Sequence, residues 1–194
     1  MKLTLASLIE KSRQSLVLCS MLLVFACAQP QPKPPVGESA DLYRTLRTAA
    51  LTRAPKDVGI SVAPDKLFVV VVDLPRPTGT ATLVTYADGS TSLYLSAGGG
   101  VIGAGGRRTV RTAANKLFTS AARAKSFATS TTSFPLPPPG EVTFYLRTPS
   151  GTSAIRASEA ELANQSHPAA ALYEEAKSVV AELGLDEAPA RARR

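Results

Sequence analysis

Tryptophan is absent from this chain of 194 residues, and cysteine and histidine are nearly absent. The two cysteines, Cys19 and Cys27, both lie near the N-terminus, so the remainder has no thiols for an internal disulfide or a cysteine metal cluster. His167 is the only histidine, which excludes any site that needs two imidazoles. We therefore expect neither a metal nor another cofactor.

Long apolar runs are also scarce. The longest, residues 16–26, follows Lys2, Lys11 and Arg13 and is shorter than the roughly 20 residues that a membrane-spanning helix needs. A basic region, a short apolar run and a small residue are the parts of a secretory signal peptide. We predict that residues 1–26 are a signal peptide removed on export, with a retained N-terminal anchor as the alternative.

The end of this run, Val24-Phe25-Ala26-Cys27, resembles the lipobox of bacterial lipoproteins. The resemblance implies cleavage before Cys27 and its acylation, with palmitate among the chains, and several acyl chains give stable membrane anchoring. The product would be a lipoprotein of the cell envelope. In a Gram-negative host, Ala28 favours the outer membrane, facing the periplasm. A periplasmic or secreted protein is the alternative.

The net charge is +7 for the whole chain and falls to +5 once the three basic residues and one acid of residues 1–26 are removed. Such a moderate excess predicts a solvated, slightly cationic surface that anionic lipid or glycan could attract. We do not expect a nucleic-acid partner, because the aromatics that would stack on bases are not clustered and export removes the chain from nucleic acid.

The exported part divides into a spacer, a domain and a tail. Residues 27–37 carry Cys27 and a proline-rich linker that favours extended conformations. Residues 38–185 are predicted to form a single α+β domain, and residues 186–194 a disordered basic tail.

Apolar spacing predicts the elements of this domain. Helices are expected over residues 39–53, 107–125 and 168–183, the last ended by Gly184. Strands are expected over residues 67–72, 80–86, 91–96, 142–146 and 153–157, and the first, a run of valines, is expected to be buried on both faces. The order α-β-β-β-α-β-β-α predicts an antiparallel sheet of about five strands with helices packed on it. This order is similar to that of profilin-like and roadblock-like modules.

Asp88-Gly89 predicts a tight hairpin between two of these strands. A two-residue turn would place Val84 opposite Leu93 and direct the side chains of Val84, Tyr86, Leu93 and Leu95 into the core. For the second hairpin, formed by residues 142–146 and 153–157, the sequence does not indicate which face points into the core.

Several segments resemble a family of small uncharacterised bacterial proteins: residues 81–84, 88–94, 98–103, 134–137 and 142–145. The likeness covers about residues 78–180. No activity is attached to that family, so the resemblance implies a domain boundary and nothing about chemistry.

Residues 98–103 match G-x-G-x-x-G between a strand and a helix, where backbone amides could hold an anion. Dinucleotide binding is disfavoured, because no acid lies between Gly103 and Glu141 to bind a ribose hydroxyl. A structural loop is the alternative. The candidate anion site consists of Gly100, Gly103, Arg107, Arg108 and Arg111.

No catalytic arrangement is evident. Ser166-His167-Pro168 is typical of a helix start with Ser166 as its cap, and Asp73 with Glu141 forms the one acid pair worth testing. We therefore interpret the domain as a non-catalytic module that binds an envelope protein or ligand. The alternatives are a small enzyme that uses Asp73, Glu141 or His167, and an anion or ligand sensor built on the glycine-rich loop.

Overall fold

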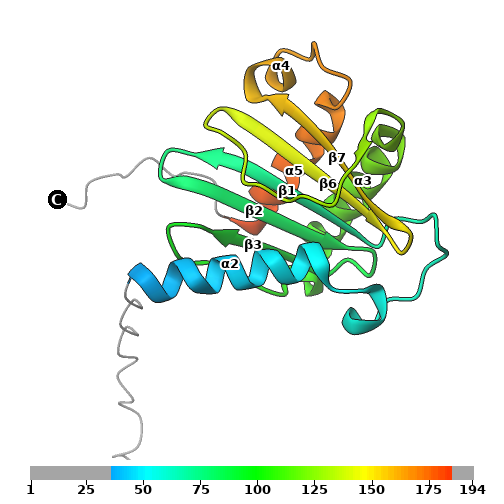
Figure 1. Cartoon of the computed structure of the whole chain (residues 1–194), viewed down its shortest axis with the longest axis horizontal. Helices are drawn as coiled ribbons and strands as arrows, with labels where there is room; N and C mark the ends of the chain where they lie inside the picture. Colours follow the sequence, from blue (N-terminus) through cyan, green and yellow to red (C-terminus); the bar gives the residue numbers. More distant parts are fainter. Residues whose placement is uncertain (1–35, 185–194) are drawn as a thin grey trace, which may run out of the picture. The chain divides into compact units, whose positions relative to one another are not determined.

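The computed structural model describes the backbone of residues 36–184 and the side chains of residues 39–184. This part of the chain forms one antiparallel sheet with helices on both faces (Figure 1). It contains no helix long and apolar enough to cross a membrane. The predicted signal peptide, the predicted acylation site Cys27 with most of its linker, and the predicted basic tail lie outside the described residues.

Four α-helices and seven strands make up the part of the chain that the structure describes. The α-helices are α2 (Val36–Thr52), α3 (Arg108–Ala124), α4 (Glu159–Ala163) and α5 (Ala170–Leu183). The strands are β1 (Val69–Arg76), β2 (Gly79–Tyr86), β3 (Thr91–Leu95), β4 (Gly100–Val101), β5 (Thr129–Ser130), β6 (Glu141–Thr148) and β7 (Gly151–Ser158). Short 3-10 turns lie at Pro55–Val58, Ala104–Gly106 and Lys125–Phe127. The strand order is β4-β3-β2-β1-β6-β7-β5.

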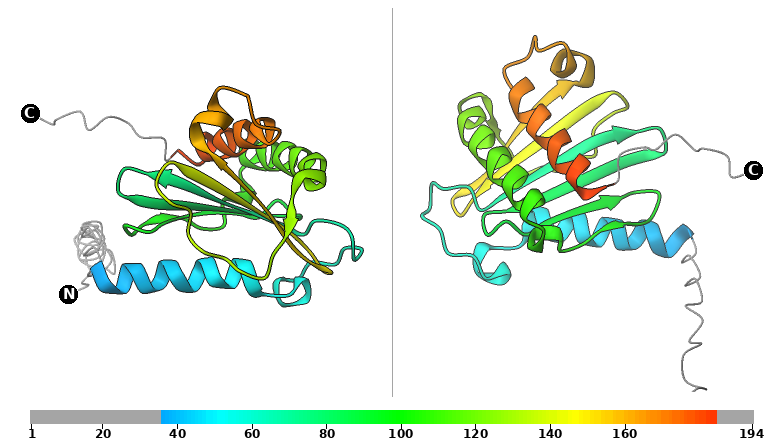
Figure 2. Two further views of the ribbon diagram at one scale, coloured as in Figure 1. Left: turned by 45° about the horizontal axis from the view of Figure 1, so that its top comes forward. Right: turned by 180° about the vertical axis from the view of Figure 1, so that it is seen from behind.

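Helices α3 and α5 pack together on one face of the sheet, and α2 lies along the other (Figure 2). The valines of β1 alternate between the two layers: Val70 and Val72 face α3 and α5, whereas Val69 and Val71 face α2. All four are fully buried. The prediction of a strand buried on both faces is confirmed.

The α+β class is confirmed, but the sheet has seven strands where about five were predicted. The two additional strands are only two residues long and lie at opposite edges. β4 forms because the glycine-rich segment turns back onto β3, and β5 forms because the chain leaving α3 runs along β7. Periodicity cannot reveal such short pairings, because two residues carry no pattern.

The hairpin at Asp88-Gly89 is present, but its turn is longer than predicted. The Tyr86 N–H donates to the Ser90 carbonyl at 2.8 Å, and Gly89 has the positive φ of +86°. The loop therefore has three residues, a common hairpin connection in which the last residue is left-handed.

The longer turn shifts the register by one residue. Leu93 lies opposite Leu83, and Val84 lies opposite Ser92. Leu83 and Leu93 face α3 and α5, whereas Val84 faces α2. The prediction that Val84 and Leu93 share one core face is therefore wrong, because a one-residue slip turns side chains to the other face.

The start of α5 also differs from the prediction. The helix begins at Ala170, and the side chain that supports its entry is His167, whose Nδ1 accepts a hydrogen bond from the Ala169 N–H at 3.1 Å. Ser166 instead donates its hydroxyl to the Glu161 carbonyl at 3.3 Å. Gly184 ends the helix in the left-handed conformation, as predicted.

Two neighbouring glycines test the contact between the hairpin turn and the 3-10 turn before α3. A Cβ on Gly105 would lie 2.8 Å from Ser90 Cα and collide with the Gly89 carbonyl, whereas a Cβ on Gly106 would meet nothing within 4 Å. We expect Gly105→Ala to lower the free energy of unfolding by about 1–3 kcal/mol through overpacking. Gly106→Ala is the matched control and should leave the urea midpoint unchanged. Equal midpoints for the two variants would contradict this packing.

Candidate functional site

Residues 129–135, which we call the strap, run along one edge of the sheet. Thr129 of β5 pairs with Ala154 of β7, and the Thr131 N–H donates to the Thr152 carbonyl at 2.9 Å. Beyond Thr131 the loop passes toward the α2 side, where the carbonyls of Phe134 and Pro135 accept hydrogen bonds from Arg47. The strap thus links the two sides of the sheet around β7.

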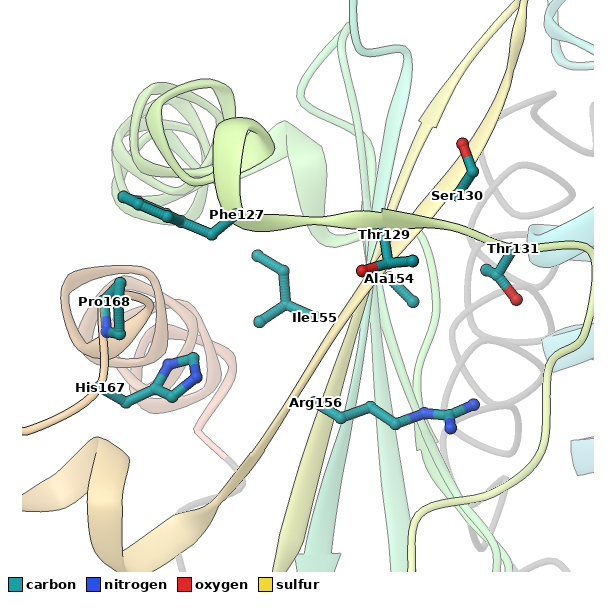
Figure 3. A pocket seen from close by; sticks show the side chains of 9 residues that line it. All are labelled: Phe127, Thr129, Ser130, Thr131, Ala154, Ile155, Arg156, His167 and Pro168. Carbon is teal, nitrogen blue, oxygen red and sulfur yellow. The ribbon is translucent and has the colours of Figure 1, made fainter.

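A hollow of about 410 Å³ lies between the strap, β7 and the start of α5 (Figure 3). We call it the edge pocket. It is lined by Phe127, Thr129, Ser130, Thr131, Ala154, Ile155, Arg156, His167 and Pro168. Figure 3 shows Phe127, Ile155 and Pro168 on one side of the pocket, with Arg156 extending toward the other.

The lining of the edge pocket combines apolar surface with hydrogen-bond donors. Phe127 is 57% exposed, although large apolar residues are usually covered. Arg156 is exposed and supplies a guanidinium. His167 accepts a hydrogen bond at Nδ1, so its neutral ring carries the proton on Nε2 and can donate there. No lining residue is acidic, so the pocket suits an anionic or carboxylate-bearing ligand with an apolar portion.

A second hollow, of about 460 Å³, lies beside the edge pocket. It shares Ser130 and Thr131 with the edge pocket. All of its lining residues except Gly151 carry a hydroxyl: Ser130, Thr131, Thr132, Thr148, Ser150, Thr152 and Ser153. The two hollows therefore adjoin along β5, and the second is the richer in hydroxyl groups.

Asp73 is fully buried in the middle of the sheet under α2. It accepts hydrogen bonds from Arg47 Nη2 at 2.6 Å and from Thr82 Oγ1 at 2.6 Å. Because Thr82 donates its proton to Asp73, the Tyr43 hydroxyl, 2.8 Å from Thr82 Oγ1, must be the donor to Thr82. Burial by itself would lower the pKa of Arg47, but the hydrogen bonds and charge of Asp73 outweigh burial and raise it. Asp73 therefore holds the Arg47 guanidinium in its charged form.

The structure does not bring Asp73, Glu141 and His167 together. Asp73 lies opposite Thr143 in the sheet and is bonded to Arg47, whereas Glu141 begins β6. Among the described residues, no hydrogen bond or ion pair joins Asp73 to Glu141. His167 lines the edge pocket, which neither acid lines.

The glycine-rich segment forms the β3–β4 turn and the approach to α3. Gly100 lies opposite Tyr94, and a Cβ there would collide with the Leu93 carbonyl, which explains the glycine. The Gly103 N–H donates to Ser92 Oγ at 3.2 Å. This amide therefore already has a partner within the protein.

The three arginines of the predicted anion site differ in their surroundings. Arg111 donates through Nε and Nη2 to the Gly105 carbonyl, at 3.2 and 3.0 Å. Arg107 and Arg108 are exposed at the start of α3. Anion binding at this loop stays a prediction that now depends mainly on Arg107 and Arg108.

Comparison with protein-family models, with curated proteins and with solved structures finds no match to this chain. The family resemblance of residues 78–180 stays a prediction. The function must therefore be inferred from the chain's own residues.

The residues of the edge pocket, His167 apart, were not singled out by sequence reasoning. Two weak signals were present: the unbroken hydroxyl run Thr129-Ser130-Thr131-Thr132-Ser133, and Arg156, a charged residue within the second predicted hairpin. Neither signal shows that the strap folds against β7, because that contact depends on the path of the chain after α3.

The buried ion pair provides a test of this arrangement. Asp73→Ala would leave Arg47 buried without its partner, and we expect a loss of about 3–5 kcal/mol in the free energy of unfolding. Asp41→Ala is the matched control, because Asp41 pairs with Arg44 on the surface and its side chain is 77% exposed. The control should leave the denaturant midpoint unchanged. A similar small effect for both substitutions would contradict a structural role for Asp73.

Proposed function

We propose that this chain is a non-catalytic binding module, held at the cell envelope through acylated Cys27, and that the edge pocket is its ligand-binding surface. The observation that carries this proposal is the lining of the pocket, which includes an exposed aromatic residue and an imidazole on one side of β7, a guanidinium that extends toward the other side, and no acidic residue. A volume of about 410 Å³ lies within the usual range of ligand pockets, about 300–1,000 Å³.

Catalysis is the weaker alternative on the same residues. An acid–base mechanism needs a second titratable group to orient or complement the imidazole of His167. Asp73 is committed to Arg47, and the lining of the edge pocket contains no carboxylate. Binding through complementary charge and apolar contact requires only the groups that are present.

The proposed location depends on the N-terminal segment. Cleavage before Cys27 would leave the proline-rich stretch as a spacer between the lipid and α2, which begins at Val36. The outer membrane, facing the periplasm, is the proposed location in a Gram-negative host, and a periplasmic or secreted protein is the alternative. The partner is then an envelope protein or ligand.

The pocket can be tested without knowing its ligand. The mature protein carrying Cys27→Ala would be sedimented with purified peptidoglycan, with outer-membrane vesicles and with immobilised periplasmic proteins. We expect Phe127→Ala to weaken binding to one of these fractions about tenfold, as loss of a buried aromatic contact does. Leu136→Ala is the matched control, because Leu136 is also an exposed apolar side chain but does not line the pocket. Equal retention of both variants would place the binding surface elsewhere.

The anchor has a separate test with its own control. Cells that express the full chain would be labelled with radioactive palmitate. We expect Cys27→Ala to abolish the label, whereas Cys19→Ala, within the predicted signal peptide, should leave the label intact. Loss of label in neither variant, or an unmodified mature N-terminus in mass spectrometry, would contradict the lipid anchor.

A further inference from the structure

The backbone of β7 leaves one position open toward the edge pocket. β7 pairs with β6 without interruption from Thr148 opposite Gly151 to Glu141 opposite Ser158. In such a ladder, the N–H and C=O groups of alternate residues point to alternate sides. The Thr152 carbonyl points outward, because it accepts from Thr131 of the strap. The backbone groups of Ala154, Arg156 and Ser158 must then also point outward.

Two of these three outward positions are already occupied. Ala154 pairs with Thr129 of β5, and the Ser158 N–H donates to the Glu161 carboxylate at 3.2 Å. The strap leaves β7 before it reaches Arg156, because residues 125–127 form a 3-10 turn. Among the described residues, no backbone group is positioned as the outer partner of Arg156.

The side chains around this open position define the chemistry of an incoming group. Arg156 and His167 place two hydrogen-bond donors of basic character on opposite sides of it, and Phe127 and Ile155 supply apolar surface on the His167 side. The neighbouring outward N–H, that of Ser158, already donates a hydrogen bond to the Glu161 carboxylate of this chain. A carboxylate therefore fits the charge of the pocket, and the edge of β7 already donates a hydrogen bond to one, that of Glu161.

We propose that the edge pocket takes an extended, acidic polypeptide segment, one residue of which continues the line of β5 and forms a backbone pair with Arg156 of β7. This inference rests on the proposed function and specifies its ligand. A strand offers both an acceptor and a donor to the one free N–H and C=O of Arg156, as in other cases of strand addition. Its carboxylates contact the Arg156 guanidinium and the His167 imidazole, and its apolar residues contact Phe127.

A polypeptide is favoured over a glycan because of the backbone geometry. Hydroxyl-rich surface and a guanidinium suit sugars as well as peptides. An open edge position with one donor and one acceptor, directly in line with an existing edge strand, is completed by the backbone of one residue of another polypeptide. A peptidoglycan fragment is therefore the competing outcome of the test.

The experiment follows the Arg156 amide itself. The mature Cys27→Ala protein, labelled with ¹⁵N, would be mixed with an acetylated and amidated heptapeptide, Ser-Val-Glu-Val-Thr-Glu-Gly, at millimolar concentration. We expect hydrogen exchange at the Arg156 amide to slow about tenfold or more, as for an amide that gains a ladder hydrogen bond. The Ser158 amide, which already has a partner, should not change.

Three controls separate the parts of the inference. A peptide with glutamine in place of both glutamates should bind about tenfold more weakly, since a charge-assisted hydrogen bond is lost. Arg156→Gln should remove this preference, whereas Arg123→Gln, on the exposed side of α3, should retain it. If Arg156→Gln does not fold, the exchange measurement and the two peptides decide the question on the parent protein.

Each contrary result has a distinct meaning. No protection of the Arg156 amide by the acidic peptide overturns strand addition. Equal binding of the glutamine peptide overturns the acidic class. If a muramyl-peptide fragment shifts the resonances of pocket residues and the heptapeptide does not, this inference fails while the proposed function stands. If the envelope fractions also bind independently of Phe127, the proposed function fails with it.

Discussion

The ion pair between Arg47 and Asp73 holds together parts of the molecule that come from four separate segments of the chain. Asp73 lies in the central strand with no solvent exposure, and Arg47 reaches it from α2 with Nη2 2.6 Å from Oδ2. The same guanidinium donates to the carbonyls of Phe134 and Pro135 in the strap loop. Thr82 of β2 completes the coordination of the carboxylate. A buried ion pair of this kind contributes little net stability, but removing one partner is costly, and it fixes which elements meet.

A second arginine secures the other end of α2. Arg147 of β6 donates to the carbonyls of Ala50 and Arg53 at 2.8 and 3.0 Å, and its guanidinium lies 4.8 Å from the centre of the Phe68 ring. A cation at the C-terminus of a helix is favoured because the last carbonyls lack partners within the helix. Burial lowers the pKa of Arg147, but a guanidinium stays charged at neutral pH. The helix that follows the linker is therefore docked on the sheet by charge at its middle and its end.

The sequence predicted the three long helices and the five long strands because each carries an apolar period several residues long. It did not predict the role of Asp73, because its partner Arg47 lies 26 residues away in the sequence. The side chains of Tyr43 and Arg47 point inward from α2 but end in polar groups, so they do not follow the apolar period of a buried helix face. The hairpin register depended on whether the turn had two or three residues, which Asp88-Gly89 allows equally. The short helix α4 could have been recognised from Ser158 and Glu161, which form a capping box. The edge pocket could not, because it exists only where the strap meets β7.

Helices on both faces leave the two edges of the sheet as the places where a partner can reach its backbone. At the β4 edge, Ile102 is 70% exposed next to a two-residue strand. At the β7 edge, the strap covers part of the strand, and its loop is fastened by Arg47 and by the Tyr145 hydroxyl, which donates to the Pro135 carbonyl at 2.8 Å. The loop that continues from the rim of the edge pocket is thus held by the arginine that docks α2. The path of this loop and the docking of α2 both depend on one buried carboxylate, that of Asp73.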